Sequence, residues 1–427
     1  MLIATPNGPA RLLTKRLRRP CFFTRFLTNI SRGLSLPGLI FMLNMEATFT
    51  IIGGGIAGLT AAIALRRQGI DPLVFEAAPE LHPVGAGLGL AANAIRALAL
   101  LGVEKEILAK GRFLEGMAFR TDKDALLIRM DTATITQRAG QDNFCIHRGD
   151  LHEALLHHLD RSRIFTGKAL ESVVHDGGRL RLRFRDGSEH LTDYLIGADG
   201  IHSAVRHVVL PDVQPRYAGY TCWRCVVPGA QPKGLQGVEE ILGPAGRFGI
   251  VPLAGNRTYW FACVNAPRRD PGMQNADAAA LAHIFAAYPA RVLDLLKASE
   301  GQPLIWGDIT DLPAGHRYDH GNIVLIGDAA HATTPNMGQG ACQAIEDAVI
   351  LAAEIGRHRN DPAEAFRRFT NRRLERTRMV VRRSRMMGQM AQWQHPVLRA
   401  LRNMLFRLTP QAVFRRQLVA LYNVDLT

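Results

Sequence analysis

The chain has 427 residues, of which 47% are hydrophobic and 21% are charged, which is typical of a globular protein with a large core. Six cysteines in so long a chain exclude a disulfide framework and favour a reducing compartment. The net charge is +14, but the arginines concentrate at the two ends and no zinc-finger or helix-turn-helix pattern accompanies them, so we expect no nucleic-acid partner.

The first 45 residues form an N-terminal extension that we do not expect to join the fold. It is Arg-rich and free of acidic residues, as a mitochondrial transit peptide is, but its prolines would break an amphipathic helix. A start codon at Met42 or Met45 explains it more simply, and Leu34–Leu43, which contains Pro37 and Gly38, is too short to span a bilayer. We therefore expect a cytoplasmic protein, or a mitochondrial one if the extension is a transit peptide.

A strand–turn–helix–strand unit follows the extension. Phe49–Ile52 and Leu73–Phe75 predict buried parallel strands, and the turn after the first strand carries the pattern G-x-G-x-x-G. The first glycine allows a tight turn, the second lets the backbone approach a pyrophosphate, and the third lets helix and strand pack closely. Glu76 ends the second strand and can accept hydrogen bonds from ribose hydroxyls, which favours FAD or NAD over NADP. The cofactor-binding residues predicted here are Gly53, Gly55, Ile56, Ala57, Gly58, Glu76 and Ala77.

Two later segments, Tyr194–Arg206 and Ile323–Leu351, also read as a strand running into a glycine-containing turn and a helix. In the second of them Asp328 can accept from a ribityl hydroxyl, and Gly338 and Gly340 let the backbone approach a flat ring. The helix that follows directs the positive end of its dipole at that ring, which stabilises a reduced flavin. Because NAD needs no such additional segment, FAD is the expected cofactor.

Between these segments the pattern changes to short strands separated by turns, and two short helices follow. Asp277 is the expected N-cap of the first helix. The strands are expected at Tyr217–Val227, Glu240–Leu242, Arg247–Pro252 and Arg257–Asn265, and the helices near Asp277–Tyr288 and Ala290–Ala298.

The first of these strands carries the candidate substrate residues Tyr217, Tyr220 and Arg224. Alternation places Tyr220 and Arg224 on one face, where they could orient a flat ring or stabilise a phenolate. They could equally fill the interdomain core, and both interpretations stay open. Cys222 and Cys225 are three residues apart on a strand and therefore point to opposite faces, so we expect no disulfide between them.

The chain from Asp361 to Leu421 is expected to be helical and divided into three helices by Pro396 and Pro410. Arginines alternate with apolar residues along it. We favour an amphipathic layer that packs on the fold and leaves a basic face in water. Peripheral attachment to acidic lipid is the alternative.

The three glycine-containing motifs, in this order and spacing, resemble the class A flavoprotein monooxygenases, the FAD-dependent aromatic hydroxylases, over residues 47–380. Residues 85–93 resemble the family's flavin-flanking loop, and residues 145–152 resemble the segment whose arginine lies against FAD. By this resemblance Pro335 lies by the reactive face of the flavin. The resemblance implies cofactor contacts at Leu88, Arg148, Asp199, Gly200, Arg206, Gly327, Asp328, Gly338, Gln339, Gly340 and Ala341.

The resemblance also implies the fold: an α/β protein in which a Rossmann-like FAD-binding domain carries an inserted mixed β-sheet substrate domain and a C-terminal helical layer. The expected boundaries are 1–45 for the extension; 46–115, 140–212 and 310–356 for the FAD-binding domain; 116–139 and 213–309 for the substrate domain; and 357–427 for the helices.

The implied activity is hydroxylation of a small aromatic or flat heterocyclic substrate with NAD(P)H and O2 through a flavin C4a-hydroperoxide. The catalytic residues predicted are Tyr217, Tyr220, Arg224 and Pro335. The absence of a second G-x-G-x-x-G unit fits transient NAD(P)H binding. An FAD-dependent reductase or oxidase, an isoprenoid epoxidase and a non-enzymatic FAD-holding binder remain alternatives. No H-E-x-x-H or cysteine–histidine cluster indicates a metal, and His331 is expected to be structural.

Overall fold

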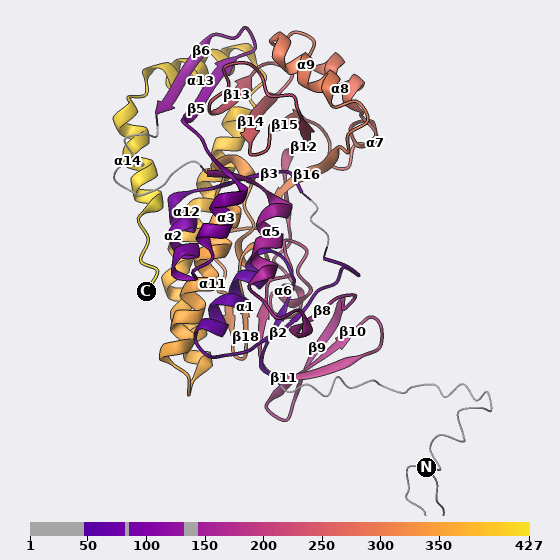
Figure 1. Cartoon of the computed structure of the whole chain (residues 1–427), viewed down its shortest axis with the longest axis vertical. Helices are drawn as coiled ribbons and strands as arrows, with labels where there is room; N and C mark the ends of the chain where they lie inside the picture. The colour runs from indigo at the N-terminus through magenta and orange to yellow at the C-terminus, as the bar shows by residue number, and fades with distance from the viewer. Residues whose placement is uncertain (1–46, 82–84, 132–143) are drawn as a thin grey trace, which may run out of the picture. The chain divides into compact units, whose positions relative to one another are not determined.

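Two large β-sheets, each with its own hydrophobic core, make up most of the structure, a computed structural model that describes residues 47–81, 85–131 and 144–427 (Figure 1). The N-terminal extension lies outside these residues, and with it the candidate start codons and the targeting prediction. Residues 132–143, which span the end of the first predicted substrate-domain segment, also lie outside them.

The first sheet has eight strands and begins with the predicted strand–turn–helix–strand unit. Its central strands run parallel in the order β18-β11-β1-β2-β8, as the apolar runs on both sides of the glycine turn predict. An antiparallel hairpin of β9 and β10 pairs with the first half of β11. The strands are β1 (Ala47–Ile52), β2 (Leu73–Phe75), β8 (Ile164–Phe165), β9 (Leu170–Asp176), β10 (Arg179–Phe184), β11 (Glu189–Gly197), β17 (Asp319–His320) and β18 (Ile323–Leu325).

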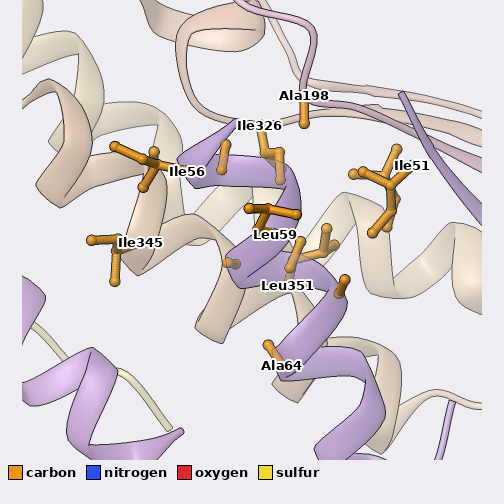
Figure 2. Close-up of a cluster of buried hydrophobic side chains, with 14 of the residues drawn as sticks. Ile51, Ile56, Leu59, Ala64, Ala198, Ile326, Ile345 and Leu351 are labelled. Atoms are coloured by element: carbon orange, nitrogen blue, oxygen red, sulfur yellow. The ribbon is translucent and has the colours of Figure 1, made fainter. Parts of the chain in front are cut away.

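The core of this half lies where helix α1 packs against helix α11 (Figure 2). Leu59 of α1 lies in the same cluster as Ile51 of β1 and Ile345 of α11, and all three side chains are buried. Small residues along α1 let the two helices and the sheet approach closely. The helices of this half are α1 (Ile56–Arg67), α2 (Ala92–Leu100), α3 (Glu104–Lys110), α5 (Arg148–His157), η2 (Arg161–Arg163), α6 (Ala204–Val209), α10 (Asp328–His331), η3 (Pro335–Met337) and α11 (Gly340–Arg357).

The second sheet has seven strands in the order β16-β12-β15-β14-β13-β5-β6. All neighbours are antiparallel except β13 and β5, so the sheet is mixed, as expected. Each predicted strand is present, with ends within two residues of the expected ones. The strands are β5 (Gly116–Thr121), β6 (Leu126–Asp131), β12 (Arg216–Pro228), β13 (Val238–Leu242), β14 (Arg247–Leu253), β15 (Arg257–Asn265) and β16 (Ile305–Asp311).

Helices α8 (Ala278–Ile284) and α9 (Ala290–Ala298) cover one face of this second sheet. Trp223 and Trp260 on that face pack into one apolar cluster with Phe285 and Leu296. The predicted cap is present, since the Asp277 carboxylate accepts from the backbone N–H of Ala280 (2.8 Å). Helix α8 ends four residues earlier than predicted, and the one-turn helix α7 (Pro271–Gln274) was not foreseen.

A three-stranded sheet and three long helices complete the fold. The small sheet has the order β3-β7-β4, with β3 at Gly87–Leu90, β7 at Phe144–His147 and β4 at Arg112–Phe113. The expected breaks at Pro396 and Pro410 divide α12 (Pro362–Ala391), α13 (Pro396–Leu408) and α14 (Gln411–Tyr422). The layer expected from the sequence is correct for α12, which buries Phe366 and Phe369, but wrong for α13, whose apolar residues face outward.

The described residues belong to one compact unit, so the boundaries between the two halves stay a prediction. The arrangement of a parallel sheet with helices, a mixed second sheet and C-terminal helices confirms the expected fold class. Within the described residues, every helix is too short or too polar to cross a bilayer.

Candidate active site

The turn between β1 and α1 has the geometry that its glycines predict. Gly53 has φ +110°, and a Cβ there would lie 2.3 Å from the carbonyl oxygen of Ala198. A Cβ on Gly58 would lie 1.9 Å from the carbonyl oxygen of Gly53, so only glycine allows this helix-to-strand approach. At Gly55, by contrast, a Cβ would meet nothing within 4 Å. No side chain caps α1, so open space faces backbone N–H groups that can hold a pyrophosphate.

Glu76 holds this turn from the end of β2. Its carboxylate accepts from the backbone N–H of Gly54 (2.6 Å) and of Ala78 (2.8 Å). Each carboxylate oxygen keeps a further lone pair, and the side chain is partly exposed, so the predicted contact with a ribose remains compatible with the structure. Ala77 beside it is exposed, and a ring nitrogen of His152 contacts the carbonyl of Gly54 (2.7 Å).

The first residues of α1 can offer a cofactor only their backbone. The side chains of Ile56 and Ala57 are buried. Gly327 fits against them with φ +57°, and a Cβ there would lie 2.9 Å from Cβ of Ala57. The N–H of Gly327 donates to Asp347 (2.8 Å), which fixes the turn that leads into α10. The main role of Gly327 is therefore to let α1 and α11 pack closely.

Arg148, Asp328 and Gly340 converge although they are far apart in the sequence. Arg148 begins α5 and packs over Gly85. A Cβ added to Gly85 would lie 2.6 Å from the Cβ of Arg148. Asp328 begins α10 and its side chain is exposed. Desolvation by the surrounding protein raises the pKa of its carboxyl, while the charges of His331 and Arg148 lower it. A Cβ on Gly340 would lie 4.0 Å from the Asp328 carboxylate. The structure thus brings together the three predicted flavin-side segments.

The loop that opens α11 is left open toward this cluster. Gly338 has φ +62° and is exposed, and a Cβ there would meet nothing within 4 Å. Gln339 is buried instead, and its side-chain oxygen accepts from Asn93 (3.1 Å) and Gln343 (2.9 Å). The N-terminus of α11 has no side-chain cap and no acidic residue in its first turn, so its dipole is available to an anionic ring near Ala341.

Strand β3 borders the same loop. The Sγ of Cys342 in α11 lies 3.4 Å from the backbone nitrogen of Ala91, which follows β3. Leu88 lies on β3 and is half-buried. The flavin-flanking loop and the start of α11 are therefore neighbours, as the family resemblance implied.

Asp199 and Arg206 have structural partners, whereas a Cβ on Gly200 would meet nothing within 4 Å. The Asp199 carboxylate accepts from the Ser203 hydroxyl (2.5 Å) and the N–H of Val205 (3.1 Å), and burial raises its pKa. Gly200 has φ +77° and completes the turn. A cofactor contact at these two residues stays a prediction.

Arg206 is only 3% exposed, and its guanidinium donates to the carbonyls of Ile201, Val213 and Ala329. Because Ala329 adjoins Asp328, Arg206 holds the helix that bears the proposed ribityl ligand. Direct cofactor contact by Arg206 has no support in this geometry, and the sequence did not reveal its positioning role.

The profile of a family described as FAD binding domain matches residues 46–384 of the chain. This chain belongs to that family. It is 37% identical over 362 residues to the aurachin C monooxygenase/isomerase of Stigmatella aurantiaca, covering 84% of this chain and 94% of that protein. It is 33% identical over 347 residues to the FAD-dependent urate hydroxylase of Klebsiella pneumoniae, covering 78% and 88% of the two chains.

Among solved structures the chain is similar to Klebsiella pneumoniae HpxO complexed with FAD and uric acid, with a TM-score of 0.81 and 30% identity over 90% of this chain and 98% of that one. The protein is thus an FAD-dependent oxidoreductase of the class A flavin monooxygenase family, and FAD is its cofactor. The open glycine positions and the uncapped starts of α1 and α11 fit an extended FAD.

In this flavoenzyme the face of the second sheet opposite α8 and α9 carries polar residues. Tyr220, Cys222 and Arg224 alternate with the buried residues of the helix-covered face, as predicted. Cys225 lies in the other cluster, so the predicted absence of a disulfide is confirmed for this pair. Arg224 is half-buried and interacts electrostatically with the Tyr259 side chain.

This sheet face touches two flavin-side segments. Near one end the ring of Tyr259 packs on Gly87 of β3, where a Cβ would lie 2.3 Å from the ring. Near the other end the side-chain amide of Asn336 donates to the hydroxyl of Tyr220 (3.1 Å), and Asn336 directly follows Pro335 in η3. The exposed Pro335 therefore stands beside the predicted substrate strand.

Sequence reasoning missed the charged pair under this contact. Arg247 donates to Glu240 (3.0 Å) and to the Asn336 amide oxygen (2.5 Å), and both members of the ion pair are buried. The guanidinium also lies 5.5 Å from the centre of the Tyr220 ring. A lone arginine in an otherwise apolar strand was the available signal, because charged residues are rarely buried without a partner.

Tyr217 does not join these residues through any described contact. Its hydroxyl donates to the carbonyl of Ala266 (2.6 Å), and the pairing of β12 with β16 shifts register between Tyr217 and Thr221. Alternation from the sequence grouped only Tyr220 and Arg224 on one face. The prediction of a catalytic Tyr217 therefore has no geometric support.

Proposed function

We propose that this flavoenzyme uses NAD(P)H and O2 to hydroxylate a small, flat aromatic or heterocyclic substrate. The observation that supports this most directly is the position of Arg224. It lies on the sheet face that contacts β3 through Tyr259 and the Pro335 loop through Tyr220 and Arg247, so a substrate on that face would lie beside both flavin-side segments. FAD, when bound, supplies the redox chemistry between NAD(P)H and O2.

Arg224 is the proposed anchor for an acidic oxygen of the substrate. Among the described residues no carboxylate forms an ion pair with it, whereas Arg247 is neutralised by Glu240. The nearest groups acting on its charge are the Cys222 thiol and the Tyr259 hydroxyl. A half-buried guanidinium in this setting favours a carboxylate or a phenolate, and binding a phenolate would raise the electron density of the ring.

Tyr220 is proposed to orient the ring and exclude water. It is 1% exposed, and burial raises the pKa of its hydroxyl to about 12, partly opposed by the Arg247 charge. Tyr220 therefore stays protonated at neutral pH and acts as a hydrogen-bond partner of Asn336, not as a base. Exclusion of water would suppress loss of reducing equivalents as H2O2.

The test is NAD(P)H oxidation by the FAD-loaded protein across aromatic acids, purines and quinolones, with H2O2 and hydroxylated product quantified. We expect at least one substrate to stimulate oxidation, with product formed in near-equal amount to NAD(P)H consumed. Oxidation that yields only H2O2 with every compound, or reduction of a substrate without incorporation of oxygen from O2, would contradict the proposal and favour an oxidase or a reductase.

A further inference from the structure

Helix α13 is an amphipathic helix whose apolar face points away from the protein. Val397 is 66% exposed and Leu408 is 69% exposed. The exposed apolar side chains recur at the spacing of helical turns and therefore share one face. They are Val397, Leu398, Leu401, Met404, Leu405 and Leu408.

The polar face of α13 is the one that contacts the protein. Arg402 is 0% exposed and donates to the carbonyl of Ala391 (2.9 Å). Arg399 pairs with Asp122 in the turn after β5 (3.5 Å), and Phe406 stacks on a phenylalanine of β5. Because these contacts fix the rotation of the helix, the apolar face cannot turn inward without leaving Arg402 unpaired.

The chain segment that contains this helix is basic. Residues 376–424 contain ten arginines and no aspartate or glutamate. Arg382, Arg383, Arg407 and Arg416 are exposed, and no carboxylate in the described part of the chain forms an ion pair with any of them. An exposed apolar row on a helix that also carries the unpaired Arg407, in an arginine-rich and acid-free segment, matches the two components of an anionic membrane surface, acyl chains and phosphate groups.

We propose that α13 docks the enzyme on an anionic lipid bilayer, with its apolar face at the headgroup boundary and the neighbouring arginines at lipid phosphates. A second copy of the chain is the less favourable occupant, because pairing this surface with itself would bring acid-free arginine clusters together. A nucleic acid would attract the arginines but leave the apolar row in water. The proposal does not depend on the substrate.

The test is co-sedimentation of the full-length, FAD-loaded protein with vesicles of phosphatidylcholine alone or with about one third phosphatidylglycerol. The variant carries Leu401→Gln and Leu408→Gln, both on the exposed face. The matched control carries Leu100→Gln and Val174→Gln, which are exposed apolar residues on α2 and β9. FAD content and thermal unfolding report that each variant is folded.

We expect binding to the anionic vesicles only, reduced on the order of tenfold or more in the α13 variant and unchanged in the control. Equal binding by the α13 variant and the unmodified protein would overturn the proposal, because the arginines of the N-terminal extension would then suffice. A dimer that dissociates in the α13 variant, without vesicle binding by either protein, would assign the face to self-association instead. If the unmodified protein bound phosphatidylcholine vesicles as strongly as the anionic vesicles, that result would contradict the role of the arginines.

Discussion

The cofactor half and the proposed substrate half of this enzyme build their sites by different means. Around the first sheet the site is made of backbone: glycine turns, exposed N–H groups and the starts of α1 and α11. On the second sheet the proposed site is made of side chains, and it rests on the buried pair of Arg247 and Glu240, which Asn336 of η3 contacts. A site made of backbone groups tolerates a substitution as long as the new side chain does not enter the cofactor space. A site made of side chains depends on buried charges, which must stay paired.

The strongest test of this comparison is removal of the buried guanidinium in the substrate half. Arg247→Ala leaves Glu240 buried without its partner and removes a donor to Asn336, so we expect the free energy of unfolding to fall by about 3–5 kcal/mol. Denaturant unfolding of the FAD-loaded protein measures this.

Two further variants are compared with Arg247→Ala. Arg257→Ala breaks a partly exposed pair with Asp150, and its expected cost is at most about 1 kcal/mol. Arg247→Met combined with Glu240→Met removes both charges and should recover most of the loss. Equal costs for Arg247→Ala and Arg257→Ala would show that the buried pair is not what stabilises this half.

A second test asks whether the substrate half binds through charge. Arg224→Gln should raise KM for an acidic substrate about ten- to a hundredfold, because a charged hydrogen bond contributes roughly 1.5–3 kcal/mol. FAD affinity should not change. Arg291→Gln is the matched control, since Arg291 lies on α9 and pairs with Asp124 (2.6 Å). Steady-state kinetics with both variants measures the effect. An unchanged KM for Arg224→Gln would show that Arg224 does not bind the substrate.

A third test separates the two roles of glycine in the cofactor half. Gly58→Ala places a Cβ 1.9 Å from a backbone oxygen and should lower the free energy of unfolding by about 1–3 kcal/mol even without FAD. Gly55→Ala enters open space, so the apoprotein should keep its stability while FAD binding weakens. Apoprotein melting and FAD titration measure the two effects. Loss of apoprotein stability in Gly55→Ala would contradict the distinction.

The smallest effect concerns alkaline pH. Burial raises the pKa of Tyr220 from 10.0 to about 12, so the folded state holds this proton more tightly. The resulting stability is present below pH 10 and is lost as pH rises toward 12, by about 1–2 kcal/mol. Tyr220→Phe should therefore flatten the decline of unfolding free energy over this range. The pKa of Tyr217 is also raised to about 12, but its side chain is partly exposed and solvent screens the effect, so Tyr217→Phe should flatten the decline less. Identical slopes for Tyr220→Phe and the unmodified protein would refute the assignment.

Many features of the fold were predictable because they depend on neighbours in the sequence. The turn at Gly53 and Gly58, the capping of α8 by Asp277 and the alternation that separates Tyr220 from Trp223 all follow from local geometry. The breaks between the C-terminal helices at proline are local in the same sense. For these features the sequence alone was sufficient.

The tertiary structure decided whatever depends on partners distant in the chain. Arg206 turned out to hold α10 through Ala329, and Arg247 found Glu240 and Asn336, because strand order and helix packing bring these residues together. The same holds for α13: its sequence shows an amphipathic helix, but only the buried contacts of Arg402 determine that the apolar face is the outer one. Periodicity defines the two faces of an element, and long-range packing chooses which of them is buried.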